Sequence, residues 1–140
     1  MMSVYKRCLV VLAGAMFPIL GYSADADKNW ISLVLANDGS KWEAMAGTFE
    51  YSKNKSDVPI AVLVGRIVSP KSSKIELHKW YVSAGDCNKK MGKLVTLSVS
   101  GEYQFENDFL FESGNVASYV AKFICDVAEQ GIKNANGKSL

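Results

Sequence analysis

The most reactive side chains in this sequence are its three cysteines. Cys8 lies in an apolar N-terminal run that we interpret as a secretion signal, so export would leave Cys87 and Cys125 as the two remaining thiols. Thiols of exported proteins are oxidised, and one pair predicts one disulfide. The alternative is a reactive or metal-binding thiol pair. Without Cys-x-x-Cys spacing, neither a zinc site nor a thioredoxin-like motif is supported.

The single histidine, His78, limits the catalytic chemistry that the sequence can support. A serine–histidine–aspartate triad, a cysteine–histidine pair or a histidine-rich metal site would have to be built around it. His78 falls in the middle of a predicted strand, beside Lys79 and Trp80, where a surface or half-buried histidine is typical. We therefore predict no catalytic residues, no metal site and no cofactor, and we do not expect an enzyme.

Four acidic residues lie close together in the last third of the sequence: Glu102, Glu106, Asp108 and Glu112. Carboxylates in such a cluster can bind calcium or act as a general acid and base. Their spacing does not match an EF-hand loop, so we interpret them as the solvated face of a strand.

Candidate protein-binding residues come from two groups. Aromatic side chains are enriched at interface hot spots, and a short basic segment beside Cys87 can contact an acidic partner, although a solubilising loop is the simpler interpretation. The candidates are Trp30, His78, Trp80, Lys89, Lys90 and Lys93.

The N-terminus predicts export. Residues 1–26 combine a basic start, an apolar run too short to span a bilayer and a small-residue cleavage site after Ser23, Ala24 or Ala26, with a retained signal anchor as the alternative. The expected organisation is a signal peptide at 1–26, a single α+β domain at 27–132 and a disordered tail at 133–140. We expect a periplasmic or secreted protein.

The charge balance restricts the choice of partners. Removing Lys6, Arg7 and Asp25 with the signal leaves 14 basic and 13 acidic residues. Nucleic-acid binding needs a concentrated basic surface, so this near-neutral chain is not expected to bind nucleic acid. No apolar run of membrane-spanning length follows the signal, so we expect no stable membrane insertion after its removal.

Hydrophobic patterning predicts strands and one helix. Alternating or continuous apolar residues favour strands over 29–36, 41–51, 59–68, 74–82, 94–100 and 103–111. Gly47 interrupts the second of these and suggests a bulge or bend, while Val95, Leu97 and Val99 are expected on the core side of the fifth. Apolar spacing predicts a helix over 115–130, capped by Ser113 or Asn115 and closed by Gly131.

These elements predict the α+β class: an antiparallel sheet of about five or six strands packed against one C-terminal helix, stapled by one disulfide. A helix of this length is about 24 Å long and 10–12 Å across, while five strand spacings make a sheet about 24 Å wide. One helix cannot cover both faces. The predicted central strand, 59–68, is nevertheless apolar on both, so sheet curling, a partner subunit or a ligand must cover the second face.

The order of features resembles the surface-adhesin protein E family of small exported bacterial proteins. The resemblance rests on Trp30, the segment 74–87 with its Asp86–Cys87 pair, and the segment 113–125 that runs from a serine to Cys125. It implies a strand-end cysteine paired with a cysteine on a helix that packs on an antiparallel sheet, and dimerisation through the sheet. Founding members are adhesins that bind host matrix and serum proteins.

We do not transfer the adhesin activity itself. The basic residues that precede the first cysteine in an adhesin are represented here only by Lys71, Lys74 and Lys79, without an arginine cluster. The expected function is an exported, non-enzymatic binding module that uses a sheet face to bind a protein partner or a second copy of itself. The alternative is a periplasmic immunity or inhibitor protein that blocks a toxin or a cell-wall hydrolase.

Overall fold

The computed structural model of the protein describes residues 29–138. The chain divides between Trp30 and Ile31 into two units, and the description below concerns the second. The predicted signal peptide and its cleavage site lie outside the described residues, so export stays a prediction.

Seven strands and two helices make up the described chain. They are β2 (Trp30–Leu35), β3 (Lys41–Met45), β4 (Glu50–Lys53), β5 (Pro59–Val68), β6 (Ile75–Ser83), α2 (Ala84–Lys89), β7 (Met91–Leu97), β8 (Tyr103–Leu110) and α3 (Val116–Lys138). The sheet order is β2-β3-β5-β6-β7-β8, with β4 paired to β5 beside this path. The pairs from β3–β5 to β7–β8 are antiparallel. The α+β class, with its sheet, C-terminal helix and disulfide, is confirmed.

Strand β5 is the centre of the sheet and has the predicted bounds. It pairs with β6 along one edge and with both β3 and β4 along the other. The predicted strand over 41–51 is therefore two strands, because Gly47 takes a positive φ of 82° in the turn between them. Glycine adopts this conformation without steric cost.

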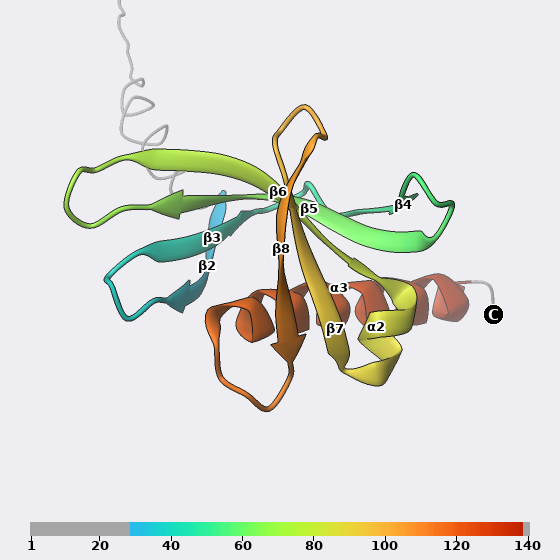
Figure 1. The fold of residues 1–140 in the computed structure, drawn as a ribbon. Coiled ribbons are helices and arrows are strands. Elements are labelled where there is room, and N and C mark those ends of the chain that lie inside the picture. Colours follow the sequence, from blue (N-terminus) through green and yellow to red (C-terminus); the bar gives the residue numbers. More distant parts are fainter. Residues whose placement is uncertain (1–28, 139–140) are drawn as a thin grey trace, which may run out of the picture. The chain divides into compact units, whose positions relative to one another are not determined.

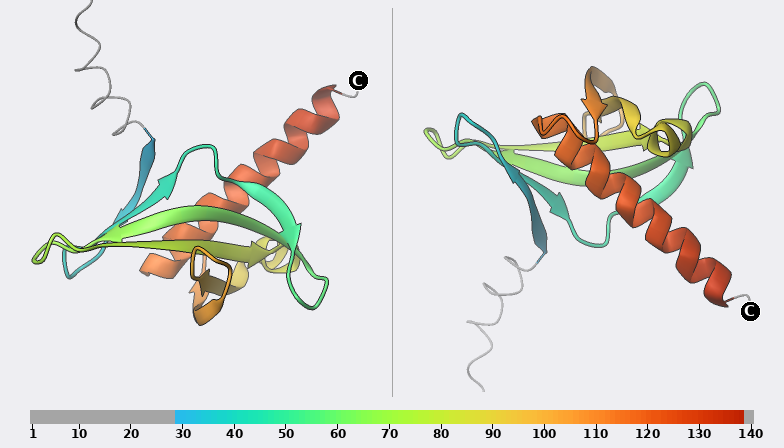
Figure 2. Two further views of the ribbon diagram at one scale, coloured as in Figure 1. Left: turned by 90° about the horizontal axis from the view of Figure 1, so that it is seen from above. Right: turned by 90° about the horizontal axis from the view of Figure 1, so that it is seen from below.

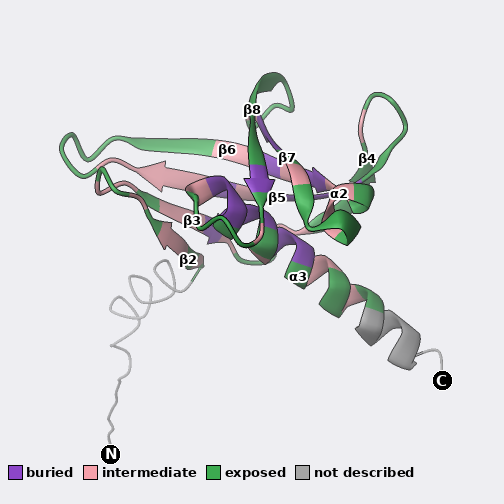
Figure 3. Cartoon of the chain, turned by 60° about the horizontal axis from the view of Figure 1, so that its bottom comes forward, coloured by how far each residue is buried: buried purple, intermediate pink, exposed green. Residues whose placement is uncertain are grey.

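Helix α3 covers one face of the sheet, as Figures 1 and 2 show. Asn115 begins it, since its Oδ1 accepts the Ser118 backbone N–H at 2.8 Å, a typical helix cap. Its buried residues follow helical spacing: Ala117, Val120, Ala121, Ile124 and Cys125. Together with sheet residues such as Leu63, Trp80 and Val82 they form the main core, seen as buried segments in Figure 3.

Gly65 interrupts the apolar run of β5 for a packing reason. The Trp80 indole lies directly over it, and a Cβ at position 65 would come within 2.1 Å of Trp80 Cζ3. Trp80 also stacks on Trp42, with ring centroids 5.3 Å apart. The glycine therefore makes room for the largest side chain of the core.

The short helix α2 was not predicted. Ser83 caps it by accepting the Asp86 backbone N–H at 3.1 Å, and Lys90 ends it in the left-handed conformation at φ 61°. Cys87 thus lies on a helix instead of a strand end, and the basic segment beside it, with Lys89, Lys90 and Lys93, belongs partly to α2 and partly to β7. Six residues are too few for hydrophobic periodicity to reveal a helix.

The predicted disulfide is present. Cys87 on α2 is bonded to Cys125 on α3, with Cα atoms 5.5 Å apart. The bond joins the connection after β6 to the middle of the helix, so it holds α3 against its face of the sheet.

Helix α3 continues past its predicted end. It runs to Lys138, so Gly131 does not close it, and the tail predicted at 133–140 is helical as far as Lys138. Gly131 has a packing role instead, because its missing Cβ leaves room for the Tyr51 hydroxyl, which donates to the Ala128 carbonyl at 2.6 Å. Within the described part of the chain, no helix is long and apolar enough to cross a membrane.

Candidate functional site: the open face of the sheet

The strand register assigns every sheet residue to one of two faces. Leu63 pairs with Trp80 and Ala61 with Val82 on the side covered by α3, which we call the helix face. The intervening pairs point the other way and define the open face. The open face carries the pairs Ile60–Ser83, Val62–Tyr81, Val64–Lys79, Arg66–Leu77 and Val68–Ile75 of β5 and β6, with Val95 and Leu97 of β7 beside them.

This register corrects the predicted orientation of β7. Leu94 and Thr96, each 1% exposed, lie on the helix face, whereas Val95 and Leu97 belong to the open face. The predicted alternation was right. Of the three residues predicted on the core side, Val95 is buried, Leu97 is half-buried and Val99 is exposed beyond the end of β7, and α3 covers the other side of the strand. The local sequence shows only that apolar side chains alternate along the strand. The position of α3 determines which of the two alternating sets of side chains joins the main core.

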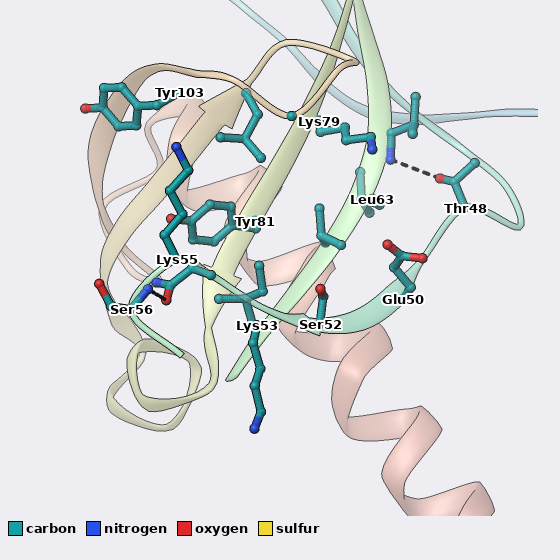
Figure 4. Close-up of a pocket in the computed structure, with 16 residues that line it drawn as sticks. Thr48, Glu50, Ser52, Lys53, Lys55, Ser56, Leu63, Lys79, Tyr81 and Tyr103 are labelled. Carbon is teal, nitrogen blue, oxygen red and sulfur yellow. Dashed lines mark hydrogen bonds between the residues drawn. The ribbon is translucent and has the colours of Figure 1, made fainter. Parts of the chain in front are cut away.

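The open face contains a hollow of about 450 Å³. Its floor is formed by apolar and aromatic side chains from three neighbouring strands: Ile60, Val62, Val64, Tyr81 and Leu97. The β4–β5 connection lines one side, and the β7–β8 hairpin, with Gly101 and Tyr103, lines the other (Figure 4). Curling of the sheet therefore shelters part of the second face, as one of the sequence alternatives proposed, and leaves a concave site.

The β4–β5 connection is held in shape by Asn54. Its Oδ1 accepts the backbone N–H groups of Ser56 at 2.9 Å and Val58 at 3.0 Å, while its own N–H donates to the Val58 carbonyl at 3.0 Å. Asp57 completes the turn at a positive φ of 65°. This asparagine-based turn carries Lys55 along the wall of the hollow, where Figure 4 shows its side chain extending past Tyr81 toward Tyr103.

Lysine amines give the hollow its charge. Lys79 is half-buried on β6 and Lys55 is exposed on the turn, and neither has an acidic partner among the described residues. Lys53 also lines the hollow, but its amine lies 3.6 Å from Asp57 and points away in Figure 4. Glu50 is the acidic residue of the lining.

A second charged group lies at the β8 side of the open face. The Lys93 amine contacts the Asp108 carboxylate and lies 4.0 Å from Glu106. The hydrogen bond and charge of Asp108 raise the pKa of Lys93. Desolvation, followed by the neighbouring Glu106 carboxylate, raises the pKa of Tyr103, whose hydroxyl donates to Glu106 at 3.2 Å.

The acidic cluster predicted as a solvated strand face is largely exposed. Glu102, Glu106, Asp108 and Glu112 are all exposed, and the Lys93 amine contacts Asp108 and lies 4.0 Å from Glu106. Among the residues that the structure describes, no group of three or more acidic, histidine or cysteine side chains is arranged to hold a metal ion.

The structure does not bring the six predicted protein-binding residues together. Trp80 is fully buried on the helix face, so its assignment as a surface contact is wrong. His78 lies on the same face, against Trp80 with ring centroids 6.3 Å apart and 3.4 Å from Glu76. Trp30 opens β2 and is partly buried.

The three predicted lysines also separate. Lys89 and Lys90 are exposed at the end of α2, while Lys93 lies on the open face in its acidic contacts. Sequence reasoning therefore missed the residues that line the hollow, Lys55, Lys79, Tyr81 and Tyr103. The one available signal was the apolar character of both faces of β5.

A second cavity of about 820 Å³ lies beside the disulfide, between β4, α2 and α3. The Lys122 amine in its lining is already 2.9 Å from Asp126, so that cation is neutralised within the helix. We favour the smaller hollow as the candidate site because two of its three lysine amines, those of Lys55 and Lys79, have no carboxylate of a described residue within 4.0 Å, whereas Lys90 is the one such lysine in the larger cavity.

Comparison with known proteins does not add a relative: no family model, curated protein or solved structure matches the chain. The resemblance to the surface-adhesin protein E family accordingly stays a prediction.

Proposed function

We propose that this chain is an exported binding module, without enzymatic activity, that receives a protein partner on the open face of its sheet. The proposal rests on a difference between the two faces of the sheet: one is covered by a helix and the other is not. Helix α3 and the disulfide occupy the helix face, while the open face has a concave apolar floor and keeps Ile75 and Leu77 about half exposed. Exposed apolar surface rimmed by charge is typical of protein-binding sites.

Two further features support this function. Cys87 and Cys125 form a disulfide, which suits the oxidising surroundings of an exported protein. The only imidazole of the sequence, His78, lies on the helix face, so the hollow on the open face has no histidine that could serve as a catalytic base.

Site-specific photocrosslinking tests the proposal. A photoreactive amino acid replaces Leu77 on the open face, and a matched variant carries it at Tyr119, a similarly exposed residue of α3. In cells that produce the protein, we expect a covalent adduct from position 77 and not from position 119. A second copy of the chain in the adduct indicates a homodimer, and a co-exported hydrolase indicates the inhibitor alternative. Adducts from position 119 alone would contradict binding through the open face.

A further inference from the structure

The hollow has the properties of a small-ligand site in its own right. Its volume of about 450 Å³ lies within the range of roughly 300–1,000 Å³ that such sites occupy, and its lining combines an apolar floor with polar and charged walls. Because a single copy of the chain provides all of these features, this inference goes beyond the proposed protein binding and does not depend on it.

The apolar part of the lining indicates that the ligand has an apolar portion that lies on the floor of the hollow. Ile60 is 7% and Val62 is 8% exposed, and the Tyr81 ring and Leu97 continue the same surface. A ligand that lies along these side chains replaces water over apolar surface, which contributes roughly 25 cal/mol for each Å² buried. An alkyl chain or a flat ring satisfies this floor, whereas a sugar would leave its hydroxyl groups unpaired there.

The charged part of the lining selects the head group. Lys79 reaches the hollow from β6 and Lys55 from the opposite wall, and the carboxylates of the described residues leave both amines unpaired (Figure 4). The neighbouring cations differ in this respect, since Lys53 contacts Asp57, Lys93 contacts Asp108, and Arg66 contacts Glu43 at 2.6 Å. A lysine amine without a counter-ion forms charge-assisted hydrogen bonds with an anion that arrives with the ligand.

We propose that the hollow binds a small amphipathic carboxylate, of the class of medium-chain fatty acids. The alkyl chain lies on Ile60, Val62 and Leu97, and the carboxylate accepts hydrogen bonds from the Lys79 and Lys55 amines. The Tyr103 ring lines the same mouth, while its hydroxyl donates to the Glu106 carboxylate at 3.2 Å and is not needed for the head group.

Amide NMR titration of the purified protein tests this site with three probes. Decanoate carries both chain and charge, decanol carries the chain alone, and acetate carries the charge alone. We expect saturable shifts of the amides of Val62, Tyr81 and Leu97 with decanoate below its micellar concentration. Decanol should bind about tenfold more weakly, since it loses charge-assisted hydrogen bonds, and acetate should not saturate.

Lysine variants identify the head-group contact. Lys79→Gln and Lys55→Gln should each weaken decanoate binding and leave decanol binding unchanged, while Lys71→Gln, in the exposed turn between β5 and β6, serves as the matched control. A loss of decanoate affinity in either variant places the ligand carboxylate at the lysine that was replaced. Equal affinity for decanoate and decanol, wild-type binding in both variants, or shifts centred on α3 would overturn the proposal. Unfolding curves establish that each variant is folded.

The titration contains no protein partner. If decanoate does not bind, the proposal of a small-ligand site is therefore wrong, but the crosslinking result for protein binding is unaffected.

Discussion

The two faces of the sheet use apolar residues for different purposes. On the helix face, Trp80 and Val82 of the sheet and Ile124 of α3 are fully buried, and the disulfide holds that helix in place. On the open face, Ile60 and Val62 are sheltered only by the curl of the sheet, and Leu77 remains 48% exposed. Both faces of β5 are apolar, but only one of them is packed against a helix. We therefore expect the helix face to contribute most of the stability, and we propose the open face for ligand contact.

The two faces also differ in their charges. Trp80, the centre of the helix face, stacks between Trp42 and His78, whereas the open face presents lysine amines around its hollow. The adjacent residues Lys79 and Trp80 belong to opposite faces of the same strand. Substitutions at neighbouring positions can therefore separate folding from binding.

The largest effect is expected from truncation at Trp80. Trp80→Ala should lower the free energy of unfolding by about 3–5 kcal/mol, because it empties the middle of the main core. Lys79→Ala, one residue away on the open face, should change it by no more than about 0.5 kcal/mol. Urea unfolding followed by circular dichroism measures both. Equal losses would show that the open face is as important for stability as the helix face.

Removal of the disulfide comes next. The double variant Cys87→Ser, Cys125→Ser should lose about 4 kcal/mol, since the bond closes a long loop of the unfolded chain. Hydrogen exchange should increase first in α2 and α3, while β5 and β6 retain protection. Urea unfolding and hydrogen exchange by mass spectrometry provide the measurements. A loss below about 1 kcal/mol, or uniform exchange across sheet and helix, would show that the bond does not hold α3 on its face.

A smaller effect links the edge of the helix face to α3. Tyr51→Phe removes the hydrogen bond to the Ala128 carbonyl and should cost about 1 kcal/mol. Gly131→Ala alone should be nearly neutral, because its helix-propensity gain of about 1 kcal/mol is offset when the new methyl displaces the Tyr51 hydroxyl. In the Tyr51→Phe background the same substitution should stabilise by about 1 kcal/mol. Thermal unfolding of the four proteins measures this coupling, and strict additivity would refute the packing role of Gly131.

The smallest effect concerns the charged edge of the open face. Because Asp108 raises the pKa of Lys93 in the folded protein, their attraction stabilises the fold below the ordinary lysine pKa of about 10.4 and is lost as pH rises through the raised pKa. Lys93→Met should therefore unfold at a slightly lower temperature than wild type at neutral pH, and the two should converge at high pH. Both groups are exposed, so added salt should also shrink the difference. A difference that grows with pH would contradict this assignment.

Much of the fold follows from local patterns in the sequence. The bounds of β5, the turns before β3 and β8, and the cap at Asn115 come from apolar runs, glycine and short polar side chains. The disulfide follows from two thiols in a chain that we predict to be exported. The sequence did not predict helix α2, which is too short to show a period, or the C-terminal end of α3, where Tyr51, distant in sequence, contacts Ala128 and Gly131.

The candidate site depended on tertiary structure. The sequence determined that Lys79 and Trp80 point to opposite sides of a strand, because successive side chains of a strand alternate. It did not determine which side α3 would cover, and so Trp80 was assigned to the surface and the lysines around the hollow were passed over. Periodicity is a property of neighbouring residues, whereas burial depends on what packs against them. The docking of α3, held by Cys87 and Cys125, decided which face became core and which face remained open.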